Sequence, residues 1–398
     1  MHILLIADGR SPIAKSWIRG LTALNHRVTL VSSYPCTPPA GLENVYTLPV
    51  AFGKLGGSQT ATPARVRSIT SPLISSARWL FMKGRYYLGP LTIPIAAQKL
   101  RQIVAASHPD IIHALRIPFE GMVAANATLP APLLISIWGN DLTLHATGSP
   151  LMQKLTRQTL QHCTALMADT HRDIRLAQKW GLGAPCPTLV VPGNGGIDIK
   201  EIQASRMQSA GFPLELPADT HLVINPRGFR PGSVRNDTFF KAIPLITARL
   251  PQTIFACAAM QGQTEAIAWV KRLQIEANTR LLPFLEQQML WQIFHRAAIS
   301  VSISVHDGTP NSLLEAMACG CFPIAGDIES LREWITPGIN GNLVNPSQPE
   351  SLAQAVISAL EDTNLRQSAA RYNDLLVRQR AEVSLVRSQI DAFYKQFL

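Results

Sequence analysis

The most suggestive residues of this chain are two acids eight positions apart, Asp307 and Glu315, in the stretch HDGTPNSLLEAMACGCFPI. Thr309 and Pro310 stand between them, and Thr followed by Pro is typical of a helix start, with Thr as the N-cap. Gly320 suits the end of that helix. We therefore expect a helix over about 310–319, with Asp307 in the loop before it and Glu315 about a turn and a half inside it.

The start of such a helix offers backbone N–H groups to an anion. The amides of Asn311, Ser312 and Leu313 should lack partners in the preceding turn, and the helix dipole adds to their attraction for a phosphate. The two carboxylates would repel the phosphate itself. They are better placed to accept hydrogen bonds from hydroxyl groups, such as those of sugars on either side of a diphosphate.

The elements that position these groups alternate between short apolar runs and amphipathic segments. In the first half we expect strands at HILLIA, RVTLVS, DIIHAL, PLLISIW and ALMADT, with helices between them such as PFEGMVAANA. A second series follows with HLVINP, TIFACAA, ISVSIS and FPIAG as strands. Strands that alternate with helices predict parallel sheets covered on both faces. The predicted fold class is α/β, with two Rossmann-like, doubly wound parallel-sheet domains that face an interdomain cleft.

The Pro- and Gly-rich stretch TLVVPGNGGIDIKEI suggests a hinge between the two domains, followed by a polar connection to Asp219. We place the first domain at 1–192 and the second at 193–377. A last helix over 378–398 keeps apolar residues at helical spacing and could pack on the first domain.

The net charge of +10 is unevenly distributed, since no acid occurs between Glu43 and Asp110. The segment 64–102 mixes bases with Trp and Tyr side chains, a combination that suits the surface of an anionic membrane. A solvated surface is the alternative explanation. Nucleic acid is the weaker prediction, because no binding motif accompanies the bases. No run approaches the roughly 20 apolar residues of a membrane span, so we expect a cytoplasmic protein, with peripheral contact at the inner face of the membrane as an option.

The stretch SVHDGTPNSLLEAMACGCFPIAGDIESLREWITPGINGNLVNP resembles the acid-x7-acid signature of the family 4 (group 1) retaining glycosyltransferases, whose fold is called GT-B. PDIIHAL, LLISIWGNDL and VVPGNGGIDI also resemble family segments, in the family's order. The resemblance implies a donor that is a nucleotide-diphosphate sugar, such as a UDP- or GDP-sugar. We expect no cofactor and no metal, because the sequence has no His/Cys/Asp/Glu cluster with ligand spacing and no DxD pattern. It also implies that Glu315 binds the ribose and Asp307 the donor sugar. The acceptor is expected to be a carbohydrate or a lipid-linked saccharide, held by the first domain.

The chain departs from the family pattern at two places. The family's diphosphate-binding Arg corresponds to Arg227, but Val234 occupies the position of the usual Lys, so Arg230 or Arg235 would have to replace it. The His of the family's His-Gly-x-Asp is replaced by Trp138.

The candidate site residues fall into three groups. The candidates for a direct part in the reaction are Asp307, Arg227 and Glu315. The candidates for donor binding are Arg227, Arg230, Arg235, Asp307, Gly308, Thr309, Asn311, Ser312, Leu313 and Glu315, with His306 beside them. The candidates for the acceptor or the cleft are Asp8, Gly9, His113, Trp138 and Asp141.

Each candidate also has a structural interpretation. Glu315 alone could lie on the polar face of its helix, Asp8 and Gly9 could form a simple turn, Asp141 could cap a helix, and His113 could make a structural hydrogen bond at a strand end.

Two other functions remain open on the sequence. A GT-B sugar-nucleotide epimerase would use the same donor site, and a catalytically silent nucleotide- or carbohydrate-binding protein would keep it without turnover. A dehydrogenase is disfavoured, because neither first-strand loop contains GxGxxG.

Overall fold

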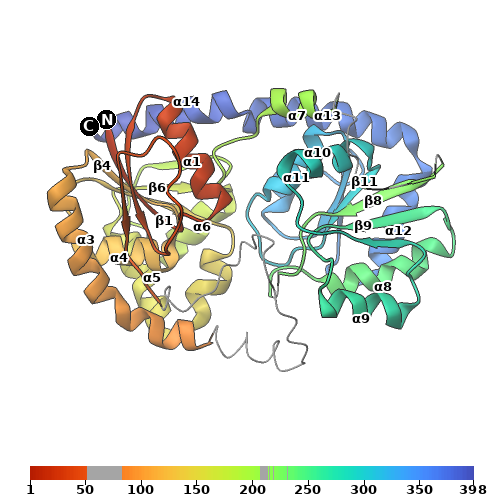
Figure 1. The fold of residues 1–398 in the computed structure, drawn as a ribbon, viewed down its shortest axis with the longest axis horizontal. Coiled ribbons are helices and arrows are strands. Elements are labelled where there is room, and N and C mark those ends of the chain that lie inside the picture. The colour runs from red at the N-terminus through yellow and green to blue at the C-terminus, as the bar shows by residue number, and fades with distance from the viewer. Residues whose placement is uncertain (52–82, 207–213, 215, 218, 231) are drawn as a thin grey trace. The chain divides into compact units, whose positions relative to one another are not determined.

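The computed structural model describes residues 1–51, 83–206, 214, 216–217, 219–230 and 232–398. The chain forms two compact units (Figure 1). The first comprises Met1–Gly196 together with Ser384–Leu398, and the second comprises Ile197–Val383. The sequence places the boundaries at 192 and 377.

The first unit is built on a seven-stranded sheet in which all strand pairs are parallel. The strands, in the spatial order β3-β2-β1-β4-β5-β6-β7, are β1 (His2–Ala7), β2 (Arg27–Ser32), β3 (Asn44–Thr47), β4 (Ile111–Ala114), β5 (Leu133–Ile137), β6 (Ala165–Ala168) and β7 (Thr188–Val190). The five inner strands were predictable from their apolar runs. The short edge strands β3 and β7 were not among the predicted elements, because three or four partly exposed residues carry little periodicity.

Helices cover both faces of this sheet, which explains why its inner strands are apolar throughout. On β1, Leu4 and Ile6 face one core and Ile3 and Leu5 face the other. The helices on the first face are α3 (Ile93–Ser107), α4 (Met122–Ala127), α5 (Pro150–His162) and α6 (His171–Trp180), and those on the second are α1 (Pro12–Ala23) and α14 (Val383–Tyr394).

The second unit repeats the architecture with six parallel strands. The strands, in the order β10-β9-β8-β11-β12-β13, are β8 (His221–Asn225), β9 (Thr253–Cys257), β10 (Thr279–Leu281), β11 (Ile299–Ser302), β12 (Phe322–Gly326) and β13 (Asn342–Val344). One face packs against α7 (Ile199–Ser205), α10 (Gln287–Arg296), α11 (Asn311–Ala318) and the end of α13 (Thr363–Ala381). The other packs against α8 (Asn236–Thr247), α9 (Thr264–Leu273) and α12 (Pro349–Glu361). The predicted fold class is therefore confirmed in its two parallel α/β sheets.

Two sequence-based expectations about the connections are wrong. The stretch after 196 is not simply a polar connection, because α7 buries Ile199 and Ile202 in the core of the second unit. The C-terminal residues do not form one helix over 378–398. The helix α13 ends at Ala381, Glu382 is extended, and α14 begins at Val383.

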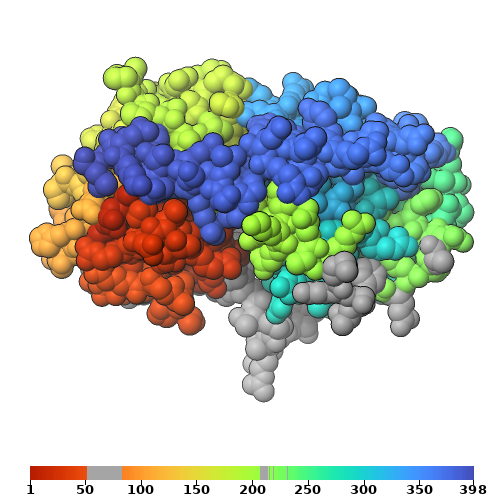
Figure 2. All heavy atoms as spheres, turned by 90° about the horizontal axis from the view of Figure 1, so that it is seen from above, coloured from red at the N-terminus to blue at the C-terminus, as the bar shows by residue number. Residues whose placement is uncertain are grey.

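The C-terminal helix α14 belongs to the first unit. Its apolar face enters the same core as α1, and His26 forms a 2.8 Å contact with Asp391. Gly20 on α1 lies against Arg387, where an added Cβ would come within 3.3 Å of the guanidinium Nε. Figure 2 shows these C-terminal residues, in blue, lying against the red N-terminal segment.

The basic segment 64–102 is described only from residue 83 onward, so its part over 64–82 lies outside the described residues. Across the described ranges, no helix combines the length and the apolar character needed to span a bilayer.

Candidate active site

The second sheet reverses its strand order between β8 and β11, and ligands of such sheets bind outside the carboxyl ends of the strands at this point. Arg227 follows β8 and Asp307 follows β11. Their side chains meet there, with Arg227 Nη2 donating to Asp307 Oδ2 at 2.6 Å. The fold thus joins two predicted site residues that are 80 positions apart in the chain.

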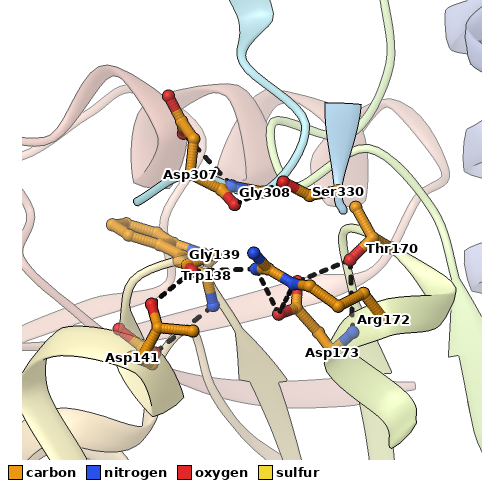
Figure 3. Close-up of polar contacts among 10 residues, drawn as sticks. Trp138, Gly139, Asp141, Thr170, Arg172, Asp173, Asp307, Gly308 and Ser330 are labelled. Atoms are coloured by element: carbon orange, nitrogen blue, oxygen red, sulfur yellow. Dashed lines mark hydrogen bonds and ion pairs between the residues drawn. The ribbon is translucent and has the colours of Figure 1, made fainter. Parts of the chain in front are cut away.

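Asp307 is held from several sides. Ser304 Oγ donates to its Oδ2 at 3.0 Å, and the backbone N–H of Gly308 donates to its Oδ1 at 3.2 Å. Ser330 Oγ donates to the backbone carbonyl of Asp307 at 2.8 Å (Figure 3). These hydrogen bonds orient the carboxylate. Because the side chain stays 17% exposed, a ligand can still reach it.

A second guanidinium lies close to this ion pair. Arg230 Nε donates to the backbone carbonyl of Arg227 at 3.3 Å. The positive charge of Arg227 is the main cause that lowers the pKa of Arg230 to about 10, with burial adding to it and Asp307 opposing it. Two guanidinium groups against one carboxylate leave an excess positive charge, which an anion bound here would compensate.

Arg235, the other candidate for the missing Lys, has different partners. Its Nε and Nη2 donate to Asp237 at 2.8 and 2.9 Å, and its Nη1 donates to Ser347 Oγ at 3.1 Å. The structure therefore brings Arg230, and not Arg235, beside Arg227.

The start of α11 differs from the expectation. The helix begins at Asn311, and Pro310, not Thr309, is the N-cap. Thr309 Oγ1 instead accepts a hydrogen bond from the indole of Trp334 at 2.9 Å. The amide of Leu313 donates to the carbonyl of Pro310, so the expectation that this amide lacks a partner is wrong.

The amides of Asn311 and Ser312 have no intrahelical partner, as expected for the first helical turn. The neighbouring His306 lies in the loop after β11, where its amide contacts the carbonyl of Ser233 at 3.5 Å.

Glu315 lies on the buried side of α11 and is only 6% exposed. Gln287, the first residue of α10, donates its Nε2 to Glu315 Oε1 at 2.9 Å. Burial raises the pKa of Glu315 to about 7, and the polar groups of Gln287 and Trp291 oppose this shift. Among the described residues, no base forms an ion pair with it. A buried carboxylate without a counter-charge is costly and often marks a functional site.

In the first unit the strand order reverses between β1 and β4. Asp8 and Gly9 follow β1. Both oxygens of the Asp8 carboxylate accept hydrogen bonds from Arg10, at 3.0 and 2.9 Å, and the amide of Gly9 donates to Ser32 Oγ at 3.0 Å. An added Cβ at Gly9 would come within 2.5 Å of Cys36 Sγ, so this loop has room only for glycine.

Asp141 is completely buried and holds the loop after β5 in place, rather than capping a following helix (Figure 3). Its carboxylate accepts from Arg116 Nη2 at 2.6 Å and from the amides of Ile117 and Trp138 at 3.1 and 3.3 Å. The guanidinium of Arg116 also lies 5.0 Å from the centre of the Trp138 ring. Burial raises the pKa of Asp141, and the ion pair with Arg116 opposes the shift.

Figure 3 also shows a group that sequence reasoning missed, at the start of α6. Arg172 Nη2 donates to Asp173 at 2.6 Å and to the backbone carbonyl of Gly139 at 2.9 Å. Thr170 is the N-cap and shares its hydroxyl with Asp173. The signal was present, since Thr170-x-x-Asp173 has the spacing of a capping box, although with Asp in place of the usual Glu or Gln.

The loop after β4 was also missed, because the stretch PFEGMVAANA was predicted as one helix. The structure has a distorted turn over Ile117–Gly121 and α4 only after it. Phe119 sits at φ 69°, which is strained for a bulky residue. The turn buries Glu120, which accepts from Ser33 Oγ at 2.6 Å, and burial raises its pKa. The sequence signal for this turn was Glu120, an acid inside the apolar stretch PFEGMVAANA.

His113 is a core residue and lines no surface. It is fully buried on β4, where Nδ1 contacts the Tyr394 hydroxyl at 2.6 Å and Nε2 contacts Ser136 Oγ at 2.8 Å. Burial lowers its pKa to about 3.

In the part of the chain that the structure describes, no three side chains of His, Cys, Asp or Glu lie together in a way that could hold a metal ion.

Comparison with known proteins assigns both units. Residues 9–194 match the family model for the glycosyl transferase 4-like domain, and residues 234–375 match the model for the glycosyl transferases group 1.

One curated relative is the GDP-mannose:cellobiosyl-diphosphopolyprenol alpha-mannosyltransferase of Xanthomonas campestris, 24% identical over 306 residues that span 72% of this chain and 76% of the relative. An uncharacterised glycosyltransferase of Methanocaldococcus jannaschii is 37% identical over 59 residues, which are only 15% of either chain. Among solved structures, Anabaena Alr3699/HepE in complex with UDP-glucose is similar over the whole length of both chains, with a TM-score of 0.70 and 18% identity.

The two family models together cover most of the chain, and each of them matches one of the two units described above. The chain therefore belongs to the group 1 (family 4) glycosyltransferases of GT-B fold, which use nucleotide-sugar donors.

Proposed function

We propose that the chain is a retaining glycosyltransferase that moves a hexose from a nucleoside diphosphate sugar to an acceptor, and that its second unit binds the donor. The observation that carries this proposal is the Arg227–Asp307 pair at the switch point of the second sheet, with Arg230 beside it. The excess positive charge suits a diphosphate, and the adjacent carboxylate suits the hydroxyl groups of the attached sugar.

Each donor-site residue has a role in this proposal. Arg227, Arg230 and the amides of Asn311 and Ser312 bind the diphosphate, and Asp307 accepts hydrogen bonds from the donor sugar. Glu315 accepts hydrogen bonds from the ribose, and Gln287, which holds one of its oxygens, orients it. Arg235, whose partners are Asp237 and Ser347, is assigned no donor contact.

The chemistry proposed for this site is stabilisation of the departing diphosphate. An acceptor oxygen bonds to the anomeric carbon on the face from which the diphosphate leaves, and the bond from that carbon to the phosphate oxygen breaks. The leaving phosphate takes the acceptor's proton. The guanidinium groups and the helix N-terminus lower the energy of the developing negative charge, as a cation would in other enzymes.

The acceptor is assigned to the first unit. Its switch point joins the loops after β1 and β4, where Asp8, Arg116 and Glu120 lie. The relative from X. campestris, whose name specifies a diphosphopolyprenol-linked acceptor, supports a lipid-linked saccharide for this chain as well.

A thermal-shift panel of UDP, GDP, ADP and their sugars tests the donor proposal. The matching nucleotide at 100 times its dissociation constant should add about 2.7 kcal/mol to stability. Arg227→Ala should abolish this gain. Arg249→Ala is the matched control, because Arg249 is an ion-paired Arg of the same unit that follows the end of α8, away from the switch point. If no nucleotide stabilises the protein, or if Arg227→Ala responds like the wild type, the donor site is wrong.

Product analysis separates the remaining functions. A transferase should release nucleoside diphosphate slowly from the donor alone, and Glu315→Ala should stop this release while the fold persists. An isomerised sugar nucleotide would instead identify an epimerase. Tight donor binding with neither product would identify a silent binding protein.

A further inference from the structure

An exposed apolar surface lies at the start of α3 in the first unit. Residues 83–88 are helical and continue through the short helix Gly89–Thr92 into α3. Four large side chains of this segment point outward, and we call them the apolar face: Tyr87 (56% exposed), Leu88 (54%), Leu91 (62%) and Ile95 (65%). They account for four of the twelve exposed large hydrophobic side chains of the described ranges, within nine residues of sequence, so they form a cluster and not a random scatter.

The opposite side of the same segment is fixed to the first unit. The Tyr86 hydroxyl contacts His145 Nδ1 at 2.8 Å, and Ser149 Oγ donates to the Tyr86 carbonyl at 2.8 Å. Gly89 packs so closely that an added Cβ would lie 2.9 Å from Ala51 and 3.0 Å from the Phe119 ring. The apolar face is therefore held outward by a well-anchored element.

Two Lys side chains flank the apolar face along its helical segment. Lys83 and Lys99 are exposed, and Lys99 lies one helical turn beyond Ile95 on the same side of α3. The sequence has no acid between Glu43 and Asp110. Exposed Leu, Ile and Tyr side chains flanked by Lys83 and Lys99, in a stretch of sequence without acids, match a surface with an apolar interior and a negatively charged rim.

We propose that the apolar face docks on an anionic lipid bilayer, with Lys83 and Lys99 at the level of the headgroups. The position of the apolar face agrees with the proposed function, and the consequence for the acceptor rests on that function. Because α3 leads into β4 and runs opposite to the strands, its first turn lies at the carboxyl edge of the sheet. The strained turn Ile117–Gly121 lies at the same edge, and Arg85 packs 4.8 Å from the ring centre of its Phe119. A membrane bound there would present a lipid-linked acceptor to the acceptor loops.

Vesicle flotation of the full-length protein tests this surface without donor or acceptor. The probes are vesicles of phosphatidylcholine alone and of phosphatidylcholine mixed with phosphatidylglycerol in equal parts. The wild type should float with the mixed vesicles, bind the neutral ones weakly, and dissociate as salt is raised. Leu91→Glu/Ile95→Glu should lower binding roughly tenfold or more. Leu375→Glu is the matched control, since Leu375 is equally exposed at 59% on α13 of the second unit, and it should bind as the wild type.

Several results would overturn the proposal. These are unchanged binding of the Leu91→Glu/Ile95→Glu variant, equal binding to neutral and anionic vesicles, or no binding at all. Loss of binding only on charge reversal of Arg65 and Arg67 would move the membrane contact to another segment. If the wild type instead forms a dimer that the double variant abolishes, the apolar face is a protein interface.

Two controls keep the outcome interpretable. Should the double variant fold poorly, Lys83→Glu/Lys99→Glu provides the same test through charge alone, because both side chains are exposed. Stabilisation by nucleoside diphosphate is measured on every variant. If the wild type lacks it but still binds vesicles, the donor proposal fails and the docking surface stands.

Discussion

Replacing Glu315 by Gln should stabilise the folded protein near neutral and alkaline pH. The carboxyl group is buried against Gln287 without a base to pair with it among the described residues, and its pKa is raised from 4.5 to about 7. A raised pKa means that the folded state binds the proton more tightly than the unfolded state. Its contribution to stability is therefore complete below about pH 4.5 and is lost as the pH rises through 7.

The size of the effect follows from the shift. A pKa difference of about 2.5 units, at about 1.4 kcal/mol per unit, corresponds to at most about 3–4 kcal/mol. Gln keeps the size of the side chain and an oxygen acceptor for Gln287 but does not titrate. The stability of Glu315→Gln relative to the wild type should therefore rise between pH 5 and pH 8 and level off above that range. For a unit of this size, 1 kcal/mol corresponds to roughly 2–4 °C in melting temperature.

Calorimetry of the nucleotide-free protein from pH 5 to pH 9 measures this directly and resolves the transitions of the two units. Glu265→Gln is the matched control, because it removes an exposed acid from α9 of the same unit. Parallel pH profiles for wild type and Glu315→Gln would refute the reasoning, since Glu315 would then be as well solvated when folded as when unfolded. With the matching nucleotide, the variant should lose affinity although it gained stability, as expected for a strained functional carboxylate.

Three further predictions concern the first unit. Arg116→Met should lower the free energy of unfolding by about 3–5 kcal/mol in chemical denaturation, because it leaves Asp141 buried without its base. The double variant with Asp141→Leu should recover part of the loss. An unchanged midpoint for the single variant would contradict the buried pair. Gly9→Ala should lower the free energy of unfolding by about 1–3 kcal/mol, because the added methyl group overpacks against Cys36, and a second change, Cys36→Ala, should restore stability. If stability is not restored, the backbone and not Cys36 excludes a side chain at position 9. His113 should stay neutral by NMR down to about pH 3. Since its pKa is lowered, the stability that it contributes above pH 6.5 should be lost as the pH falls towards 3, and His113→Gln should remove this pH dependence. A titration near pH 6 would contradict its burial.

Much of the donor side could be predicted from the sequence because its signals are local. Apolar runs of five or six residues predicted the inner strands, and the acids, Thr-Pro and Gly of the 306–324 stretch predicted a loop followed by a short helix. These features depend on backbone preferences and spacing, which neighbouring residues determine. The resemblance to the family then placed Arg227 and Asp307 in one site, and the structure brings the two side chains together.

The partners of each side chain depended on contacts between distant segments. Arg230 and Arg235 are equivalent by sequence, and only the folded loop pairs Arg235 with Asp237 and leaves Arg230 beside Arg227. The strained turn at Phe119 is invisible to helix propensity, since tertiary contacts overrode a local preference.

The sequence by itself determined the family, the two parallel sheets and the residues available for the donor site. The tertiary structure decided which of these residues are buried, paired or exposed, from Glu315 inside the second unit to Leu91 and Ile95 on the surface of the first. The physical reason is that the identity and spacing of residues are properties of the chain, whereas solvation and charge pairing depend on which distant segments surround a side chain, and these exist only once the units have folded.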